Sequence, residues 1–268
     1  MVIDFHTHVF PEKIAERTIA HLSEKGGIPP FSDGTVNGIL ARMEEAGVDC
    51  AVNLPVVTAP KQFDSVNRFA TELNTAFAGK ERNLLSFAGI HPECEEIDKK
   101  MKWIRENGFL GVKIHPDYQG TFINADGYVR IMECAKEYDL IVVTHAGVDV
   151  GFPECTHCTP ALTKELIRKV PHSKFVIAHM GGNEMWDEVL ELLCDEDVYF
   201  DTAYVLRAIG EDMFKKLLAR RGADRILFAS DSPWSDMTKD VEILKSFSLG
   251  KETEKRLFSE NAKSLLNL

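Results

Sequence analysis

The chain has 268 residues, of which 44% are hydrophobic and 27% are charged, and its formal net charge is −11. This composition is typical of a soluble globular protein, and the length suits two small domains or one α/β barrel. The negative charge argues against nucleic-acid and anionic-membrane partners, because both require a basic surface. No apolar run of about 18 residues is present, so no transmembrane helix is expected.

The first element is a short apolar strand over residues 2–5, which leads directly into His6-Thr7-His8. A polar helix is predicted over 12–23. A loop rich in helix breakers covers 26–35, and a helix follows over 36–46, where Gly47 ends it. Because the segment after the first strand is long, it could form a lid over the end of that strand.

Beyond residue 50, short apolar strands alternate with helices. Continuously apolar strands are buried on both faces, and their alternation with helices favours a parallel sheet. Eight strand–helix units in this length predict an α/β protein, a single (β/α)₈ TIM barrel over residues 1–268, with an open doubly wound sheet as the alternative. The expected strands after the first are 50–54, 84–90, 110–114, 140–144, 175–178, 198–200 and 225–230, and the helices are 63–78, 95–106, 127–138, 160–169, 184–194 and 210–221, with helices over the remainder.

Six of the nine histidines and one aspartate stand at the ends of predicted strands. Side chains alternate along a strand, so two imidazoles two residues apart face the same way and can hold one metal ion. In barrels of this kind the active site lies at the carboxyl ends of the strands, where we therefore predict a metal site. The other three histidines are expected to be solvated or in loops. The residues at strand ends are His6, His8, His91, His115, His145, His179 and Asp231.

The ordered motifs resemble those of the amidohydrolase superfamily, and within it the amidohydrolase-related group that includes aminocarboxymuconate semialdehyde decarboxylase. The resemblance covers essentially the whole chain and follows the family's order. It is specific for the superfamily and does not specify a substrate. The motifs are Asp4-Phe5-His6-Thr7-His8, Gly111-Val112-Lys113-Ile114-His115-Pro116, Thr144-His145, Ala178-His179-Met180-Gly181-Gly182 and Ser230-Asp231-Ser232-Pro233-Trp234.

The resemblance implies a divalent metal ion, which we expect to be Zn²⁺, held by His6, His8, His145 and Asp231. One ion per chain is favoured and two remain open. Such an ion lowers the pKa of a bound water toward neutrality. Asp231 would then carry the proton, and His179 would act in catalysis rather than as a tight ligand.

Lys113 and His115 share one face of the fourth predicted strand, and both are candidates for metal or substrate contact. Two-metal members of the superfamily carry a carboxylated lysine on this strand. A plain amine paired with a carboxylate is the alternative for Lys113. His91, which precedes a proline, either joins the site or hydrogen-bonds to loop backbone.

Candidate substrate contacts lie in the loops after the strands. Phe152, Trp186, Tyr204 and Trp234 are candidate apolar walls, with packing as the alternative role. Arg207 could bind a substrate carboxylate, because a guanidinium pairs with it through two hydrogen bonds. A role as a helix-surface arginine is the alternative.

Cys155 and Cys158 form a CxxC pair in the loop after the fifth predicted strand. Such a pair can bind metal or form a redox couple. A structural zinc site needs two further ligands, and no second CxxC exists, so we expect thiols. The scattered cysteines and the absence of a secretory segment favour a cytoplasmic location.

The leading functional hypothesis is a metal-dependent hydrolase that attacks a small-molecule amide, ester or lactone with a metal-activated water. The alternative is a non-oxidative decarboxylase of an unsaturated or aromatic acid at the same site. A metal-binding protein without catalysis is a third reading, which predicts a missing ligand, whereas every position is filled here. The expected partner is a small-molecule substrate, and a homo-oligomer stays open.

Overall fold

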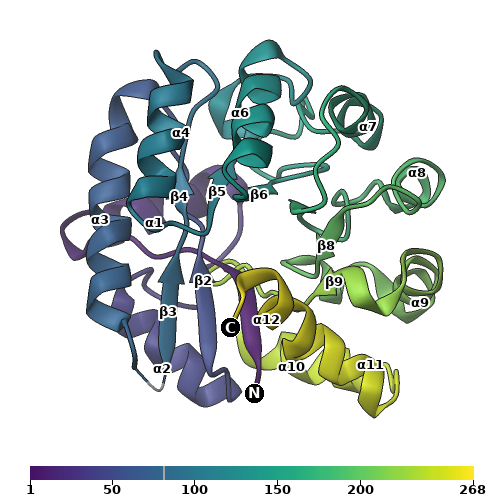
Figure 1. Ribbon diagram of the computed structural model, residues 1–268. Helices are drawn as coiled ribbons and strands as arrows, with labels where there is room; N and C mark the ends of the chain where they lie inside the picture. Colours follow the sequence, from purple (N-terminus) through teal and green to yellow (C-terminus); the bar gives the residue numbers. More distant parts are fainter. Residues whose placement is uncertain (81) are drawn as a thin grey trace.

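The computed structural model describes residues 1–80 and 82–268. Short strands run through the centre of the molecule and helices surround them (Figure 1). The elements expected from the sequence are present, with ends that differ by a few residues. The strands are β1 (Ile3–Thr7), β2 (Cys50–Asn53), β3 (Asn83–Ser86), β4 (Ala88–Gly89), β5 (Gly111–Ile114), β6 (Ile141–Thr144), β7 (Phe175–Ile177), β8 (Tyr199–Asp201) and β9 (Ile226–Leu227).

The helices follow the strands and form the outer layer. The expected helix over 12–23 extends to Gly26, and a short additional helix, α5, follows β5. The helices are α1 (Glu12–Gly26), α2 (Val36–Ala46), α3 (Phe63–Phe77), α4 (Ile97–Glu106), α5 (Pro116–Gln119), α6 (Asp126–Glu137), α7 (Pro160–Lys169), α8 (Trp186–Leu192), α9 (Gly210–Arg221), α10 (Met237–Ser246), α11 (Lys251–Lys255) and α12 (Asn261–Leu266).

The strands pair in sequence order and all in parallel, as expected for a (β/α)₈ barrel. The strand predicted over 84–90 is divided at Phe87, so the ladder falls into a sheet of β1–β3 and a sheet of β4–β9. The Phe87 ring lies edge-on to Phe5 and occupies the space where a side chain on Gly111 would stand. The interruption therefore makes room for a bulky ring inside the barrel.

The first and last strands meet without a continuous ladder. The Phe5 amide donates to the Phe228 carbonyl at 2.9 Å, the Asp231 amide donates to the His6 carbonyl at 2.8 Å, and the His8 amide donates to the Ser232 carbonyl at 2.7 Å. These bonds close the ring of strands and hold the segment that carries Asp231 beside the segment that carries His6 and His8.

A bulge in β1 sets the direction of His6. Ile3 pairs with Cys50 and Thr7 with Asn53, so β1 has one residue more than β2 over this span. Phe5 belongs to the hydrophobic cluster inside the barrel, and its neighbour His6 lines the cavity at the carboxyl end of the barrel. A bulge lets two consecutive side chains face the same side, which ordinary alternation forbids.

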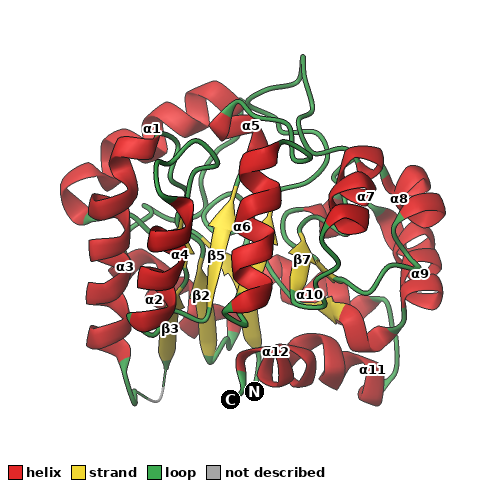
Figure 2. Ribbon diagram, turned by 45° about the horizontal axis from the view of Figure 1, so that its top comes forward, coloured by secondary structure: helices red, strands yellow, loops and turns green. Residues whose placement is uncertain are grey.

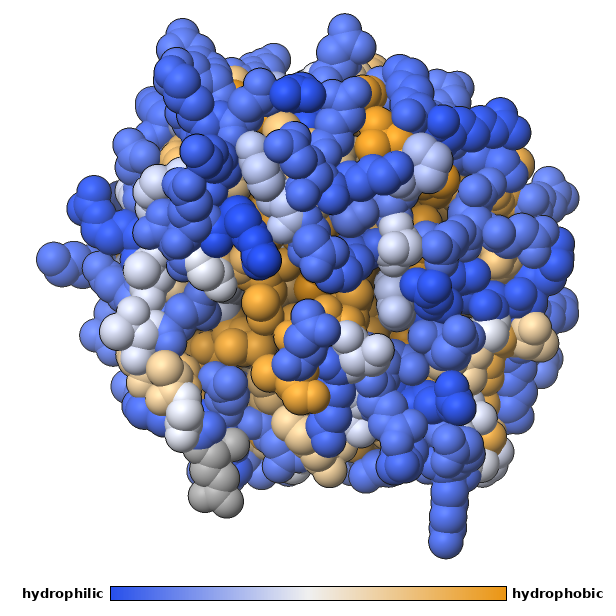
Figure 3. Space-filling model, viewed as in Figure 1, coloured by the Kyte–Doolittle hydropathy of each residue, from blue (hydrophilic) through white to orange (hydrophobic). Residues whose placement is uncertain are grey.

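The core has an inner and an outer part. Inside the ring, Ile3, Val52 and Val143 belong to one cluster. A larger cluster lies between sheet and helices, where Val112 and Ile131 are both buried. Figure 3 shows the face with the chain termini, where hydrophilic residues cover most of the surface and hydrophobic residues appear in the centre.

The helix α1 lies over the carboxyl end of the barrel, on the side opposite to the chain termini (Figure 2). Residues 27–35 then return the chain to α2, which begins where the Thr35 hydroxyl accepts a hydrogen bond from the Gly38 amide at 3.0 Å. This arrangement confirms the expected lid. Among the helices of the described residues, none has the length and apolar content needed to cross a membrane.

Candidate metal centre

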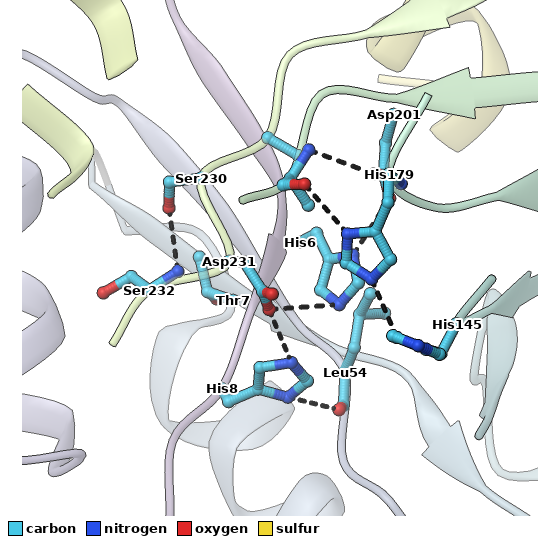
Figure 4. A network of polar contacts seen from close by, with 12 residues as sticks. His6, Thr7, His8, Leu54, His145, His179, Asp201, Ser230, Asp231 and Ser232 are labelled. Atoms are coloured by element: carbon cyan, nitrogen blue, oxygen red, sulfur yellow. Dashed lines mark hydrogen bonds and ion pairs between the residues drawn. The ribbon is translucent and has the colours of Figure 1, made fainter. Parts of the chain in front are cut away.

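Three of the predicted ligands meet at the carboxyl end of β1. Nε2 of His8 lies 3.0 Å from Oδ1 of Asp231, and Nε2 of His6 lies 3.5 Å from the same oxygen. Figure 4 shows both rings directed at this carboxylate. Two imidazole nitrogens and a carboxylate oxygen are a donor set that suits Zn²⁺ and related divalent ions.

The other nitrogen of each ring is already engaged. Nδ1 of His8 lies 2.9 Å from the Leu54 carbonyl, which can only accept, so this nitrogen carries the proton. Nδ1 of His6 lies 2.9 Å from Oδ2 of Asp201 and donates to it. The Nε2 atoms of both rings therefore face Asp231, an arrangement that a cation between them would stabilise. The residues present fit a divalent metal ion.

The protonation states also suit metal binding. Burial lowers the pKa of His6 well below its usual value, and the neighbouring Lys113 lowers it further. Burial by itself would raise the pKa of Asp231, but the nearby His6 and His8 outweigh it and lower this pKa to about 2. Neutral imidazole and ionised carboxylate are the forms in which these groups bind metals.

His145, the fourth predicted ligand, lies in a second group with His115 and Asp149. Nε2 of His115 lies 3.4 Å from Oδ2 of Asp149, and Nε2 of His145 lies 3.7 Å from the same oxygen. The two rings are stacked, with centroids 4.2 Å apart. Ligation of the first site by His145 stays a prediction, because its ring points at this second group in the structure.

Two acidic residues of this second region did not emerge from the sequence. Asp149 follows His145 by four residues, and Asp117 follows the His115-Pro116 pair. Oδ2 of Asp117 is buried without a hydrogen-bond partner and lies 3.7 Å from Nε2 of His145. Both acids follow a histidine at a strand end within a few residues. This pattern is too common in sequences to identify a site residue without the structure.

His179 stands between His6 and His145 (Figure 4). Its Nδ1 donates to the Ala203 carbonyl at 2.8 Å, so its Nε2 is an acceptor and lies 2.9 Å from Nδ1 of His145. Its ring centroid is 5.6 Å from that of His6. The histidine predicted to act in catalysis therefore borders the three clustered ligands.

Lys113 is buried beside the first group. Its Nζ lies 3.0 Å from Nε2 of His6. Among residues 1–80 and 82–268, no carboxylate oxygen lies within 4.0 Å of this nitrogen, so the alternative of an amine paired with a carboxylate is not found. Burial lowers the pKa of Lys113 to about 8.

A cavity of about 880 Å³ opens from these residues. Three of the predicted apolar walls, Phe152, Tyr204 and Trp234, line it, as do Lys113 and His115. A histidine expected to be solvated, His21 of α1, lines it too.

The other candidates lie outside this cavity. Trp186 donates from its indole nitrogen to the His179 carbonyl at 3.2 Å and so supports the strand end. The Arg207 guanidinium lies 3.8 Å from Asp236 and does not line the cavity, so a contact between Arg207 and a substrate stays a prediction. Nδ1 of His91 accepts from the Glu93 amide at 3.1 Å, the loop-backbone role left open from the sequence.

The CxxC residues have separate surroundings. Cys155 is exposed and Cys158 is buried, and neither forms a disulfide. The Cys158 sulfur lies 3.4 Å from the Thr163 hydroxyl. Both therefore remain thiols, as expected.

A family model described as an amidohydrolase matches residues 3–268. The chain belongs to the amidohydrolase family. No curated protein matches it by sequence.

Solved structures of similar fold cover nearly the whole chain. A 5-carboxyvanillate decarboxylase from Sphingomonas paucimobilis has a TM-score of 0.73 at 12% identity, covering 100% of this chain and 99% of its own. A dihydroxybenzoic acid decarboxylase from Polaromonas sp. JS666, with bound manganese and the inhibitor 2-nitroresorcinol, has a TM-score of 0.71 at 16% identity, with coverages of 100% and 97%. An uncharacterized TIM-barrel protein from Bordetella bronchiseptica has a TM-score of 0.79 at 14% identity, with coverages of 99% and 98%. At such identities the likeness establishes the TIM-barrel fold of this amidohydrolase.

Proposed function

We propose that this amidohydrolase is a metal-dependent, non-oxidative decarboxylase of a small unsaturated or aromatic carboxylic acid. The observation that carries the proposal is the position of Lys113, whose ammonium lies beside the His6 donor atom and lines a largely apolar cavity. A carboxylate at the metal ligands would meet this second positive charge, and apolar walls would hold an unsaturated body. The decarboxylases of similar fold support the same choice.

His6, His8 and Asp231 would hold the metal ion, with His145 as the predicted fourth ligand. When bound, the ion supplies positive charge for a substrate oxygen. Zn²⁺ remains our expectation, and Mn²⁺ is worth testing because a decarboxylase of similar fold contains manganese.

The chain's own residues would then position the acid and move a proton. Loss of CO₂ breaks the carbon–carbon bond and leaves its electron pair on the substrate, and a proton must reach that carbon. We assign this transfer to Asp231, which lies 3.0 Å from His8. Because Asp231 is ionised, it would first take a proton from a substrate hydroxyl group or from solvent water and then pass that proton to the carbon. His179, held by the Ala203 carbonyl, has an acceptor Nε2 that lies 2.9 Å from Nδ1 of His145, and it would orient a substrate hydroxyl group that takes the place of His145 at this nitrogen.

Isotope labelling tests the proposal. Aromatic and unsaturated acids labelled with ¹³C in the carboxyl group should release ¹³CO₂. In D₂O the product should carry deuterium at the carbon that had borne the carboxyl group. Asp231→Asn should lower turnover at least 1,000-fold, on the order expected for loss of a proton carrier. Asp224→Asn, which neutralises an acid outside the cavity, is the matched control and should stay active. Absence of CO₂ release across the panel would refute the decarboxylase.

Hydrolysis of an amide, ester or lactone is the second candidate. The observation in its favour is the lowered pKa of Asp231, about 2, because an ionised carboxylate can accept a proton from water. A parallel panel of amides, esters and lactones, incubated in ¹⁸O-labelled water, decides between the two reactions. Incorporation of ¹⁸O from labelled water without release of CO₂ would establish the hydrolase.

A further inference from the structure

The lid helix α1 presents a row of basic side chains to the cavity. Arg17, His21 and Lys25 follow one another at intervals of four residues, which places them on one face of the helix. All three line the same cavity as His6 and Asp231. The row therefore faces the metal ligands from the opposite wall of one continuous space.

The two permanent charges in this row have no acidic partner. In the part of the chain that the structure describes, no carboxylate oxygen lies within 4.0 Å of the Arg17 guanidinium or the Lys25 ammonium, although ion pairs are frequent elsewhere on this acidic protein. Nζ of Lys25 instead lies 3.3 Å from the ring centroid of Phe152 and 4.8 Å from that of Tyr118. Both rings line the cavity as well, so the ammonium is held at its edge.

The acidic residues of α1 do not line this cavity. Glu12 and Glu16 line a separate cavity, and Glu24 lines neither. A chain of net charge −11 thus places only basic groups of this helix toward the cavity. Unpaired cations at the wall of a cavity attract anions, and the low dielectric of the walls strengthens the attraction.

The space between the basic row and the metal ligands has apolar walls. Ile14 and Leu22 of α1 and Val66 and Phe69 of α3 line it. Along α1, Arg17 and Lys25 are about 12 Å apart, so the row can meet ligands of different lengths. A ligand that fills this space needs an apolar middle and an anionic end beneath α1.

We propose that Arg17 and Lys25 form an anion subsite that holds a second carboxylate of the substrate, at the far end of the cavity from His6, His8 and Asp231. The substrate is then a dicarboxylic acid with an apolar body. This inference rests on the proposed function for the identity of the reacting end, a carboxylate at the metal ligands. Arg207, which the sequence suggests as a ligand for a substrate carboxylate, does not line the cavity.

Calorimetric binding tests the subsite without any turnover. The probes are adipate, suberate and sebacate, each compared with the monocarboxylate of equal carbon number, hexanoate, octanoate or decanoate. These saturated acids bind by charge and length alone. In the wild-type protein at low salt, at least one dicarboxylate should bind 10-fold or more tightly than its monocarboxylate partner.

Charge removal on α1 completes the test. The double variant Arg17→Gln, Lys25→Gln should lose this preference, while its affinity for the monocarboxylates stays within about twofold of wild type. Lys13→Gln removes a charge from the same helix outside the cavity and should keep the preference. The replaced side chains are exposed, so the variants should fold, and circular dichroism checks this.

Two results would overturn the subsite. One is a wild-type protein that binds no dicarboxylate more tightly than its monocarboxylate partner, and the other is a preference that survives in the double variant. The outcome is separable from that of the reaction assay. A clear dicarboxylate preference without CO₂ release would refute the decarboxylase and support the subsite. CO₂ release without the preference would support the decarboxylase and refute the subsite.

Discussion

Nδ1 of His6 lies 2.9 Å from Oδ2 of Asp201, and both side chains are buried. The two residues are 195 positions apart and come from β1 and β8. The bond fixes the proton on Nδ1 and leaves the Nε2 atom of His6 unprotonated, as a metal ligand must be. The other oxygen of Asp201 accepts from the His179 amide at 2.9 Å and from the Ala203 amide at 3.1 Å. One carboxylate therefore orients a predicted ligand and holds the strand end that carries His179.

Asp201→Asn should weaken metal binding about 10- to 100-fold, the range typical of residues that orient metal ligands. The two backbone amides hold the amide oxygen of the new side chain, so its NH₂ group faces His6 and shifts the proton of that ring to Nε2. Equilibrium dialysis with Zn²⁺ and Mn²⁺ measures the change. The control is Asp195→Asn, which neutralises an exposed acid close to Asp201 in the sequence. Unchanged affinity in Asp201→Asn would contradict the orienting role.

His8→Ala should reduce the bound metal to well below one equivalent per chain, because it removes one of three clustered donors. His91→Ala should keep its metal, because His91 hydrogen-bonds to loop backbone and does not line the cavity. Elemental analysis of protein purified without a His-tag measures both. Equal loss in the two variants would mean that the metal is not bound where His6, His8 and Asp231 meet.

Lys113→Met should retain about one equivalent of metal. The amine lies 3.0 Å from Nε2 of His6, where an ammonium competes with a cation, so its removal should leave affinity equal or higher. A carboxylated Lys113 that bridges two ions predicts the opposite, a fall from two equivalents to one or none. Metal content before and after the substitution, with mass spectrometry of the intact chain for the added CO₂, separates these cases.

Burial raises the pKa of Asp240 to about 7 and the nearby Asp236 adds to this, although Arg207 acts against it. A raised pKa in the folded state means that the folded protein holds this proton more tightly than the unfolded chain, whose carboxyl has a pKa of 3.8. The free energy of unfolding therefore falls as the pH rises from about 4 to about 7, and then levels off.

Asp240→Asn should remove this part of the pH dependence. Relative to wild type, the variant should gain on the order of 2–3 kcal/mol in free energy of unfolding between pH 4.5 and pH 8. Urea unfolding at both pH values measures it, and other buried carboxylates contribute equally to both proteins. If the two proteins keep a constant difference across this range, Asp240 is ionised in the folded state throughout.

Much of the architecture followed from the sequence because it depends on local patterns. Continuously apolar strands separated by amphipathic helices can bury both faces of a sheet only in an α/β arrangement, and eight units close a ring. Parallel strands in that ring carry their carboxyl ends to one side. The histidines after the strands and Asp231 therefore had to meet at one end of the barrel, and His6, His8 and Asp231 do so.

Contacts between distant segments were decided only by the tertiary structure. The bulge that turns His6 inward depends on pairing of β1 with β2, and the engagement of its ring depends on Asp201 from β8. The grouping of His145 with Asp149, and the turn of α1 that brings Arg17 over the cavity, likewise depend on where loops settle. The path of a loop is set by its packing against several elements at once. The spacing of residues along one segment therefore does not predict that path.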